Sequence, residues 1–299
     1  MIAAGNPDVK TARRPREGGR RFPLHWIGAF PFLLYVGLFL LLPTVIVVVG
    51  AFVGKDGPSL SNITDLNQGF VLNAFVSSLL ISTASAVVGA VAGALLAYAV
   101  ATGNPRGVLR RVVSSACGVL AQFGGVTLAF AFIATIGSVG FIRLWIQDRG
   151  IDIYANGVWL TELPGLVLVY TYFQIPLMVL VFLPALDGIR PQWREATESL
   201  GGGTWHYWRY VAGPLLAPAF LGATLLLFAN AFSAYATAAA LISQGNPIVP
   251  IAISNFLTSE TGRNNPGLAQ ALALGMVVIV AVVMTLYALL QRRTSRWLR

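Results

Sequence analysis

The stretch that decides the fold reads EATESLG at residues 195–201 and continues to VAGP at residues 211–214. It is short, polar and broken by glycine, with charges in its first half and aromatic residues in its second. Long apolar segments lie on both sides of it, at 163–186 and 218–242. A polar loop between two such segments indicates a connection between membrane spans.

The composition extends this reading to the whole chain. Of 299 residues, 56% are hydrophobic and 10% are charged, whereas soluble domains carry about 25% charged residues. Charged residues are absent from six stretches: 22–54, 66–105, 112–142, 163–186, 210–259 and 264–291. Each contains about 20 apolar residues or more, enough to cross a bilayer. The predicted spans are 25–53, 72–101, 113–139, 163–186, 218–242 and 268–290.

These spans are expected to be helices, because a backbone in lipid must satisfy its own hydrogen bonds. The apolar runs are continuous rather than alternating, which excludes a β-barrel. The sequence therefore predicts an all-α integral membrane protein with six transmembrane helices. A basic tail at 1–21, expected to be disordered, precedes the membrane domain at 22–291, and a second basic tail follows at 292–299.

The basic residues predict the orientation of the chain. Sixteen of the 20 Lys and Arg residues lie in the two tails and in the loops 102–112 and 187–217. The positive-inside rule places such segments in the cytoplasm. Six spans put both termini on one side, so the two arguments agree that both termini are cytoplasmic. The outer loops 54–71, 140–162 and 243–267 are too short to fold around a core of their own.

Other classes of function fit the sequence poorly. The net charge of +9 lies beside the spans, where anionic lipid headgroups are nearer partners than nucleic acid. The first apolar run is too long for a signal peptide and is interpreted as a retained span. Cys117 stands alone, so there is no disulfide framework, and His25 and His206 lack the spacing of a metal site.

A stripe of small residues marks the second span. Ser85, Gly89, Gly93 and Ala97 recur at four-residue spacing. Small residues on one face let a neighbouring helix approach closely in a membrane. We expect this face to pack against another span.

Polar residues in spans three and four are candidates for lining a pore. Gln122 precedes a Gly-Gly pair, and Tyr170 and Gln174 lie near Pro176. A proline inside a helix bends it and frees a carbonyl group, which a neighbour or water in a cavity must satisfy. Pore lining and simple packing are both open for these side chains.

Span five carries a second set of candidates. Asn230, Ser233 and Thr237 follow one another at three- and four-residue steps, which places them near one helical face. This face lines either a translocation path or a helix–helix contact. Because the spans contain no charged residue, a proton or ion relay is not favoured.

The polar loop itself predicts a helix–turn–helix. Residues 193–200 can form two helical turns with Glu195 and Glu198 near the favourable N-terminal end. Glycines at 201–203 stop that helix. Residues 205–211 can form a second amphipathic turn whose aromatic side chains suit the headgroup level.

The loop resembles a known family at this point. Glu195-Ala196, Gly201, Val211 and Pro214 are similar in type and spacing to the "EAA" loop of permease subunits of bacterial type I ABC importers, the binding-protein-dependent, MetI-like class. The resemblance covers roughly residues 70–290. The compact six-span form is most similar to spermidine/putrescine-type permeases, and next to iron(III), thiamine and phosphonate permeases. The departures are Thr197 and Gly202, where alanine is usual, and Gly213, where leucine is usual.

The resemblance implies a transmembrane permease subunit that forms half of a pore in a bacterial plasma membrane. It implies three protein partners: ABC ATPase subunits, a second permease that is identical or homologous, and an extracytoplasmic substrate-binding protein. The substrate expected from it is a small polar solute such as a polyamine. The residues expected to couple the chain to the ATPase are Glu195, Ala196, Thr197, Glu198, Gly201, Val211 and Pro214.

The chain is not expected to be an enzyme. It has no G-x-x-x-x-G-K-[ST] loop to cradle phosphates, so it is expected to bind no cofactor, with ATP and Mg²⁺ on the partner ATPase. A membrane-embedded enzyme would need a catalytic constellation that is not seen. A stand-alone secondary transporter or channel is the main alternative, although such proteins commonly carry intramembrane charge or inverted repeats. Co-purification with an ATPase separates these readings.

Overall fold

The computed structural model describes residues 25–54, 57–104, 107–155, 157–242, 248–258 and 265–295. The chain divides into two units, residues 1–46 and 47–299. The tail predicted at 1–21 lies outside the described residues, as does the end of the tail predicted at 292–299.

The first span is helical from α1 into α2. It comprises α1 (His25–Val36), a π-helical turn (Gly37–Leu41) and α2 (Leu42–Ala51). Pro31 lies inside α1 without ending it. The ring of Tyr35 lies 5.0 Å from that of Phe39, one helical turn further on. The segment Phe30–Ala51 is long and apolar enough to cross a membrane.

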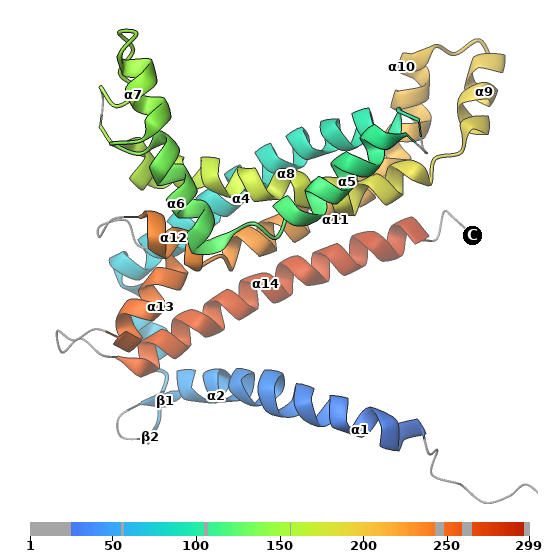
Figure 1. The fold of residues 1–299 in the computed structure, drawn as a ribbon. Helices are drawn as coiled ribbons and strands as arrows, with labels where there is room; N and C mark the ends of the chain where they lie inside the picture. The colour runs from blue at the N-terminus through green and yellow to red at the C-terminus, as the bar shows by residue number, and fades with distance from the viewer. Residues whose placement is uncertain are drawn as a thin grey trace, which may run out of the picture. The chain divides into compact units, whose positions relative to one another are not determined.

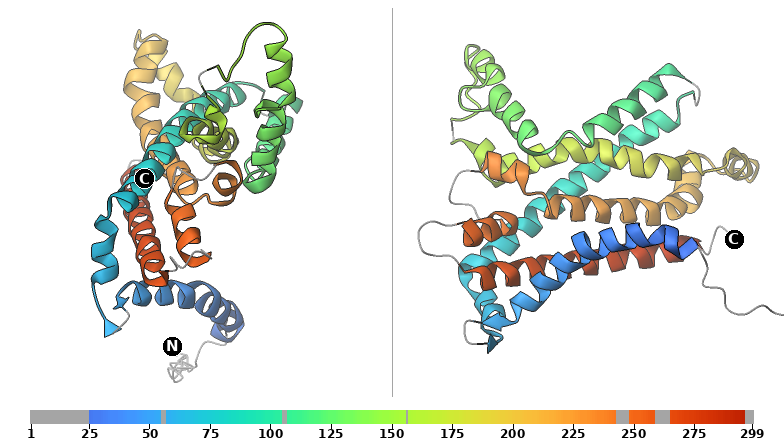
Figure 2. Two further views of the ribbon diagram at one scale, coloured as in Figure 1. Left: turned by 90° about the vertical axis from the view of Figure 1, so that its left-hand side faces the viewer. Right: turned by 60° about the horizontal axis from the view of Figure 1, so that its bottom comes forward.

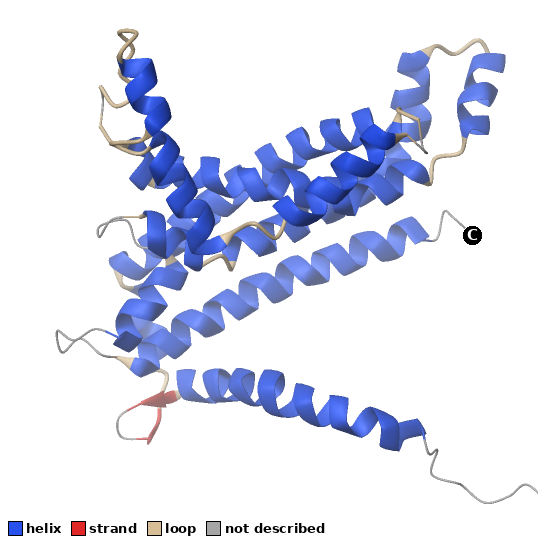
Figure 3. Ribbon diagram, in the orientation of Figure 1, coloured by secondary structure: helices blue, strands red, loops and turns tan. Residues whose placement is uncertain are grey.

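The second unit is almost entirely helical where it is described (Figures 1 and 3). A short antiparallel hairpin joins β1 (Val53–Gly54) to β2 (Gly57–Pro58), with Val53 opposite Pro58. The helices that follow are α3 (Ser61–Thr64), α4 (Gly69–Ala101), α5 (Val108–Leu120), α6 (Gly125–Ile136), α7 (Phe141–Gln147), α8 (Leu163–Asp187), α9 (Pro191–Ser199), α10 (Thr204–Tyr207), α11 (Gly213–Phe232), α12 (Ala236–Leu241), α13 (Val249–Thr258) and α14 (Pro266–Ser295). Short 3₁₀ turns occupy Asp65–Asn67 and Trp159–Thr161, and a π-helical turn occupies Trp208–Ala212.

The prediction of an all-α fold with six spans is confirmed. The described residues contain six helical segments long and apolar enough to cross a membrane. They are Phe30–Ala51, Gly69–Ala101, Gly125–Gln147, Leu163–Asp187, Thr204–Phe232 and Pro266–Leu289. Within the second unit, α9 and α10 lie where α8 ends and α11 begins, whereas α6, α7 and α12 lie at the opposite end (Figures 1 and 2).

The small-residue stripe packs against α8, as predicted. Ser85 and Ala97 are fully buried on α4. A Cβ built onto Gly89 would lie 2.7 Å from the Cβ of Gln174, and one built onto Gly93 would lie 2.5 Å from the Cβ of Met178. Real Cβ atoms do not approach so closely, so the contact between α4 and α8 depends on glycine at these positions.

The third span departs from the prediction of one helix over 113–139. Helix α5 ends at Leu120, the chain unwinds, and α6 begins at Gly125 with a φ of +73°. This left-handed conformation is accessible to glycine at no steric cost. The Gly124-Gly125 pair therefore permits a break that the apolar pattern does not reveal.

The fifth span departs from the predicted 218–242 at both of its ends. The helix already begins at Thr204 and runs through the π-helical turn into α11. Pro214 is the second residue after that turn, where the regular hydrogen-bond ladder is already interrupted. At the other end, α11 stops at Phe232 and α12 begins at Ala236. The helix is therefore longer at its start and broken near its end.

Candidate functional site: an exposed helix–turn element and a cavity between two helix breaks

The first half of the polar loop is a well-formed helix with a defined stop. Helix α9 ends in a Schellman motif, in which Gly201 takes a φ of +78°. The N–H of Gly202 donates to the carbonyl of Thr197 at 2.9 Å, and the N–H of Gly201 donates to the carbonyl of Glu198 at 3.0 Å. These two bonds satisfy carbonyls that a helix end leaves free, so the turn that follows α9 is fixed in direction.

The tip of this element carries large exposed apolar side chains. Leu200 is 89% exposed and Trp205 is 74% exposed. Glu195 and Ala196 are also exposed, while Thr197 is half-buried. Arg194 donates through Nε to Glu198 at 3.0 Å across one turn of α9. Exposed apolar groups beside an ordered charged face are typical of a surface that binds a partner.

The second half of the loop corrects the prediction of a separate short helix at 205–211. Helix α10 continues through the π-helical turn, which contains Val211, into α11, which contains Pro214. The loop is therefore one free helix, α9, followed by an N-terminal extension of the next span, not two short helices. Val211 is half-buried and Pro214 is exposed.

Two of the three departures from the usual loop pattern, Thr197 and Gly202, complement each other. A Cβ built onto Gly202 would lie 2.8 Å from the Cγ2 of Thr197 and 3.0 Å from its carbonyl oxygen. The extra methyl group of Thr197 thus fills space that an alanine at position 202 would need. Neither position, taken alone in the sequence, reveals that Thr197 and Gly202 fit together.

The base of the element is tied to neighbouring spans. Asp187, the last residue of α8, pairs with Arg110 of α5. The ring of Trp208 lies 5.3 Å from that of Tyr98 on α4, in an edge-to-face arrangement. Helix α9 begins four residues after Asp187, so the element starts close to the contacts with α5 and α4.

A cavity of about 290 Å³ lies between the two helix breaks. Its lining comes from the break between α5 and α6, from α8, and from the end of α11 with the start of α12. The lining residues are Ala121, Gly124, Gly125, Phe173, Asn230, Ser233, Ala234, Tyr235, Ala236 and Thr237.

Two hydrogen bonds connect the two helix breaks to each other and to α8. The N–H of Gly125, at the start of α6, donates to Oγ1 of Thr237 at 2.9 Å. The hydroxyl of Tyr170 on α8 donates to the carbonyl of Ala234 at 2.6 Å. Both bonds reach backbone groups of unwound or terminal residues, which need partners at membrane depth. The two breaks are therefore coupled to each other and to α8.

The polar residues predicted for span five all reach this cavity, although not through a shared helical face. Asn230 lies on α11, Ser233 caps its end, and Thr237 lies on α12. Asn230 and Ser233 are exposed, whereas Thr237 is 3% exposed. The break between the helices, and not helical periodicity, brings them together.

The candidates on spans three and four lie elsewhere. Gln122 is exposed within the break but does not line the cavity. Tyr170 is 1% exposed and Gln174 is fully buried. Nε2 of Gln174 donates to Oγ of Ser85 at 2.9 Å, so Gln174 lies in the contact between α4 and α8. The structure thus favours packing over pore lining for both side chains.

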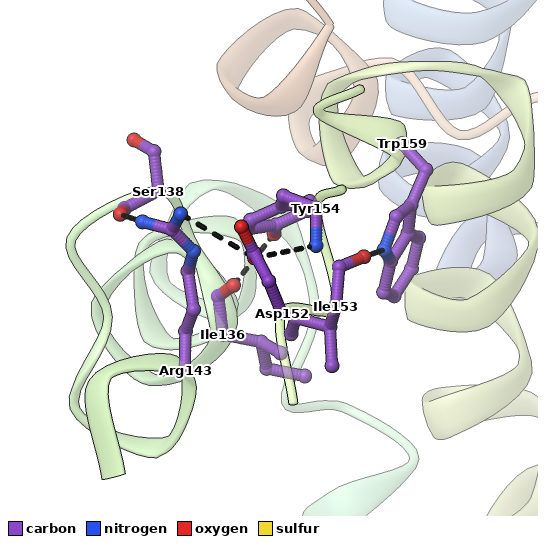
Figure 4. A network of polar contacts seen from close by, with 7 residues as sticks. All are labelled: Ile136, Ser138, Arg143, Asp152, Ile153, Tyr154 and Trp159. Carbon is purple, nitrogen blue, oxygen red and sulfur yellow. Dashed lines mark hydrogen bonds and ion pairs between the residues drawn. The ribbon is translucent and has the colours of Figure 1, made fainter. Parts of the chain in front are cut away.

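The segment between α6 and α8 folds into a compact polar network (Figure 4). Arg143 donates to the carbonyl of Ser138 and pairs with Asp152 at 3.6 Å, and its guanidinium lies 5.1 Å from the ring centre of Tyr154. The hydroxyl of Tyr154 donates to the carbonyl of Ile136 at 2.6 Å. Burial raises the pKa of Tyr154 above its usual value of 10.0, with Arg143 opposing, so this donor stays protonated at neutral pH.

Comparison with known proteins identifies the family. Residues 89–296 match the model of the family described as "Binding-protein-dependent transport system inner membrane component". The chain belongs to this family. The match begins at Gly89 in α4 and includes the helix–turn element and the cavity.

Curated relatives of this permease cover most of its length. It is 26% identical over 222 residues to the trehalose transport system permease protein SugB of Mycobacterium tuberculosis, covering 74% of this chain and 73% of SugB. It is 30% identical over 224 residues to a probable molybdenum ABC transporter permease protein of Haloferax volcanii, covering 75% and 77%. It is 26% identical over 279 residues to the sulfate transport system permease protein CysW of Escherichia coli, covering 91% and 90%.

The fold of the permease matches solved transporters. A chain of a bacterial alginate ABC transporter, crystallised with an alginate pentasaccharide-bound periplasmic protein, gives a TM-score of 0.72 at 18% identity and covers 90% of this chain and 94% of that one. This protein is therefore a multi-pass membrane permease subunit of an ABC importer, and ATP hydrolysis lies on a separate subunit.

Proposed function

We propose that this permease forms half of a translocation path and that the helix–turn element α9–α10 docks on its ATPase. The observation that carries the proposal is the construction of the element. Its tip exposes Leu200 and Trp205, its turn is fixed by the Schellman motif at Gly201, and its base is anchored on membrane helices. The residues expected at the contact remain Glu195, Ala196, Thr197, Glu198 and Gly201, with Val211 and Pro214 in the helix behind it.

Two helices connect the element to the cavity. One is α11, which is continuous with α10 and ends at Phe232 beside the cavity. The other is α5, which is held at its start by the pair between Arg110 and Asp187 and ends at the break that contains Ala121. When the ATPase moves the element, both helices move, so the two sides of the cavity shift together. This arrangement supports alternating access.

The remaining partners follow from the same proposal. A second permease, identical or homologous, would complete the path, and an extracytoplasmic binding protein would deliver the substrate. The alginate transporter that shares this fold was crystallised with its periplasmic protein, which supports that expectation. We propose a bacterial plasma membrane location with cytoplasmic termini, no cofactor on this chain, and ATP with Mg²⁺ on the ATPase.

The substrate is proposed to be a small polar solute. The relatives described above are named for trehalose, molybdenum and sulfate. These names do not favour the polyamine expected from the resemblance to spermidine/putrescine-type permeases, and that narrower assignment is not retained.

Affinity purification tests the docking proposal. The tagged full-length permease, extracted from its native membrane, should co-purify an ABC ATPase. Leu200→Asp should remove most of that ATPase, because it places a charge on the apolar tip. Leu60→Asp is the matched control, since Leu60 is 62% exposed on a different loop, and it should retain the ATPase. Equal recovery from both variants would contradict docking at α9–α10.

The orientation can be checked by cysteine labelling in intact cells. In a Cys117→Ala background, Ile151→Cys on the outer loop should react with an impermeant maleimide, because residue 151 is 61% exposed. Ser199→Cys, on exposed α9, should react only after permeabilisation. Labelling of Ser199→Cys in intact cells would reverse the proposed topology.

A further inference from the structure

We infer that the cavity between the helix breaks is a binding site for an uncharged, hydroxyl-bearing solute of the saccharide class. This inference rests on the proposed function, because it treats the cavity as part of the translocation path. It adds the chemistry of the solute that the path accepts.

The polar groups that line the cavity are neutral, and together they offer both donors and acceptors of hydrogen bonds. The Asn230 side chain is exposed and has no hydrogen-bond partner among the described residues. Its amide offers two donors and an acceptor. The hydroxyl of Ser233 donates to the carbonyl of Ala229 at 3.0 Å, which leaves its lone pairs free to accept. Sugar hydroxyls both donate and accept, so they complement this set.

The apolar part of the lining also suits a sugar. Phe173 and Tyr235 supply aromatic rings to the cavity, and Tyr235 is 44% exposed. The hydroxyl of Tyr235 is 3.0 Å from Oγ of Ser254 on α13, which fixes the position of its ring. Small-molecule sites are mostly apolar and aromatic with a few placed polar groups. The C–H faces of a sugar ring can pack on such rings while its hydroxyls reach Asn230 and Ser233.

Charged solutes are disfavoured by the same lining. None of the residues that line the cavity is charged, and the surrounding stretches 112–142, 163–186 and 210–259 contain no Asp, Glu, Lys or Arg. Moving a charge from water into a site without a partner costs far more free energy than moving a neutral polar group there. A polyamine would find no carboxylate here. A sulfate would find no cation, and the Gly125 N–H is already bonded to Thr237.

The part of the cavity that this subunit forms is large enough for a small sugar. At about 290 Å³, it lies near the lower end of small-molecule sites, roughly 300–1,000 Å³. It can therefore accommodate one small sugar or one unit of a longer saccharide.

Protection of a reporter cysteine tests the inference. Ala236 lines the cavity and is exposed, so Ala236→Cys in a Cys117→Ala background serves as the reporter in membrane vesicles that contain the full-length chain. A small hydrophilic methanethiosulfonate should label it. Glucose or trehalose should slow the labelling about threefold at a concentration of about twice Kd, following the factor 1 + [L]/Kd. Sulfate and spermidine should leave the rate unchanged.

Two further variants make the result specific. Adding Asn230→Ala to the reporter should abolish protection by the sugars. Labelling of Leu200→Cys, outside the cavity, should be unaffected by every solute. Protection by sulfate or spermidine, an unreactive reporter, no protection by either sugar, or protection that survives Asn230→Ala would each overturn the inference. Co-purification of the ATPase with a chain that fails this test would leave the docking proposal standing.

Discussion

Substrate uptake is expected to fall about tenfold or more in a Gly201→Val variant, while the protein still accumulates in the membrane. Gly201 has a φ of +78°, and a left-handed backbone costs a non-glycine residue about 1–2 kcal/mol, with β-branched residues the least tolerant. A cost of about 1.4 kcal/mol is a factor of ten in a population. The two bonds of the Schellman motif would be lost with that conformation, so α9 would no longer meet the ATPase at a fixed angle.

The expected effect comes from the left-handed backbone at Gly201 and not from a steric clash of the new side chain. The control variants separate these two causes. No atom lies within 4 Å of a Cβ built onto Gly201 or onto Gly203. Gly203 has an ordinary φ of −87°, so Gly203→Ala should keep uptake near normal. Gly201→Asn should fall between the two, because asparagine tolerates the left-handed region better than valine. Uptake by the valine variant at the level of the unmodified protein would refute the coupling role of the turn.

The second large effect is expected from Gly93→Leu, which should prevent the folded permease from accumulating. A Cβ at position 93 would lie 2.5 Å from the Cβ of Met178 and 2.7 Å from the carbonyl oxygen of Ile175. The backbone carbonyl cannot move aside, so α4 and α8 must separate. Overpacking of a close-packed interior costs about 1–3 kcal/mol, and more when the backbone is in the way. Membrane abundance and the thermal unfolding midpoint in detergent measure the loss.

Gly118→Leu is the matched comparison for that experiment. Gly118 also lies inside a helix, α5, but no atom lies within 4 Å of a Cβ built onto it. Its replacement should leave abundance and the unfolding midpoint close to those of the unmodified protein. If both leucine variants behave alike, the packing of α4 on α8 through Gly93 is not what stabilises the fold.

The sequence by itself determined the features that depend on local pattern. Long uncharged apolar runs place the spans, because the cost of burying charge in lipid acts on each segment separately. The four-residue spacing from Ser85 to Ala97 predicts a packing face, since side chains at that spacing share one side of a helix. The element around Glu195 and Gly201 can also be predicted from the sequence, because the start of a helix and its glycine stop are set within about ten residues.

Only the tertiary structure decided which polar residues meet. Helical periodicity groups Asn230, Ser233 and Thr237 on one face, yet the chain unwinds after Phe232 and a cavity, not a helix face, gathers them. Tyr170, distant in sequence, donates to the carbonyl of Ala234 in that break, and Thr237 accepts from the N–H of Gly125 in the other break. The role of Gln174 likewise depends on a distant residue, because its hydrogen-bond partner Ser85 lies 89 positions away. Partners so far apart are found only on folding, and at membrane depth they decide whether the backbone stays helical.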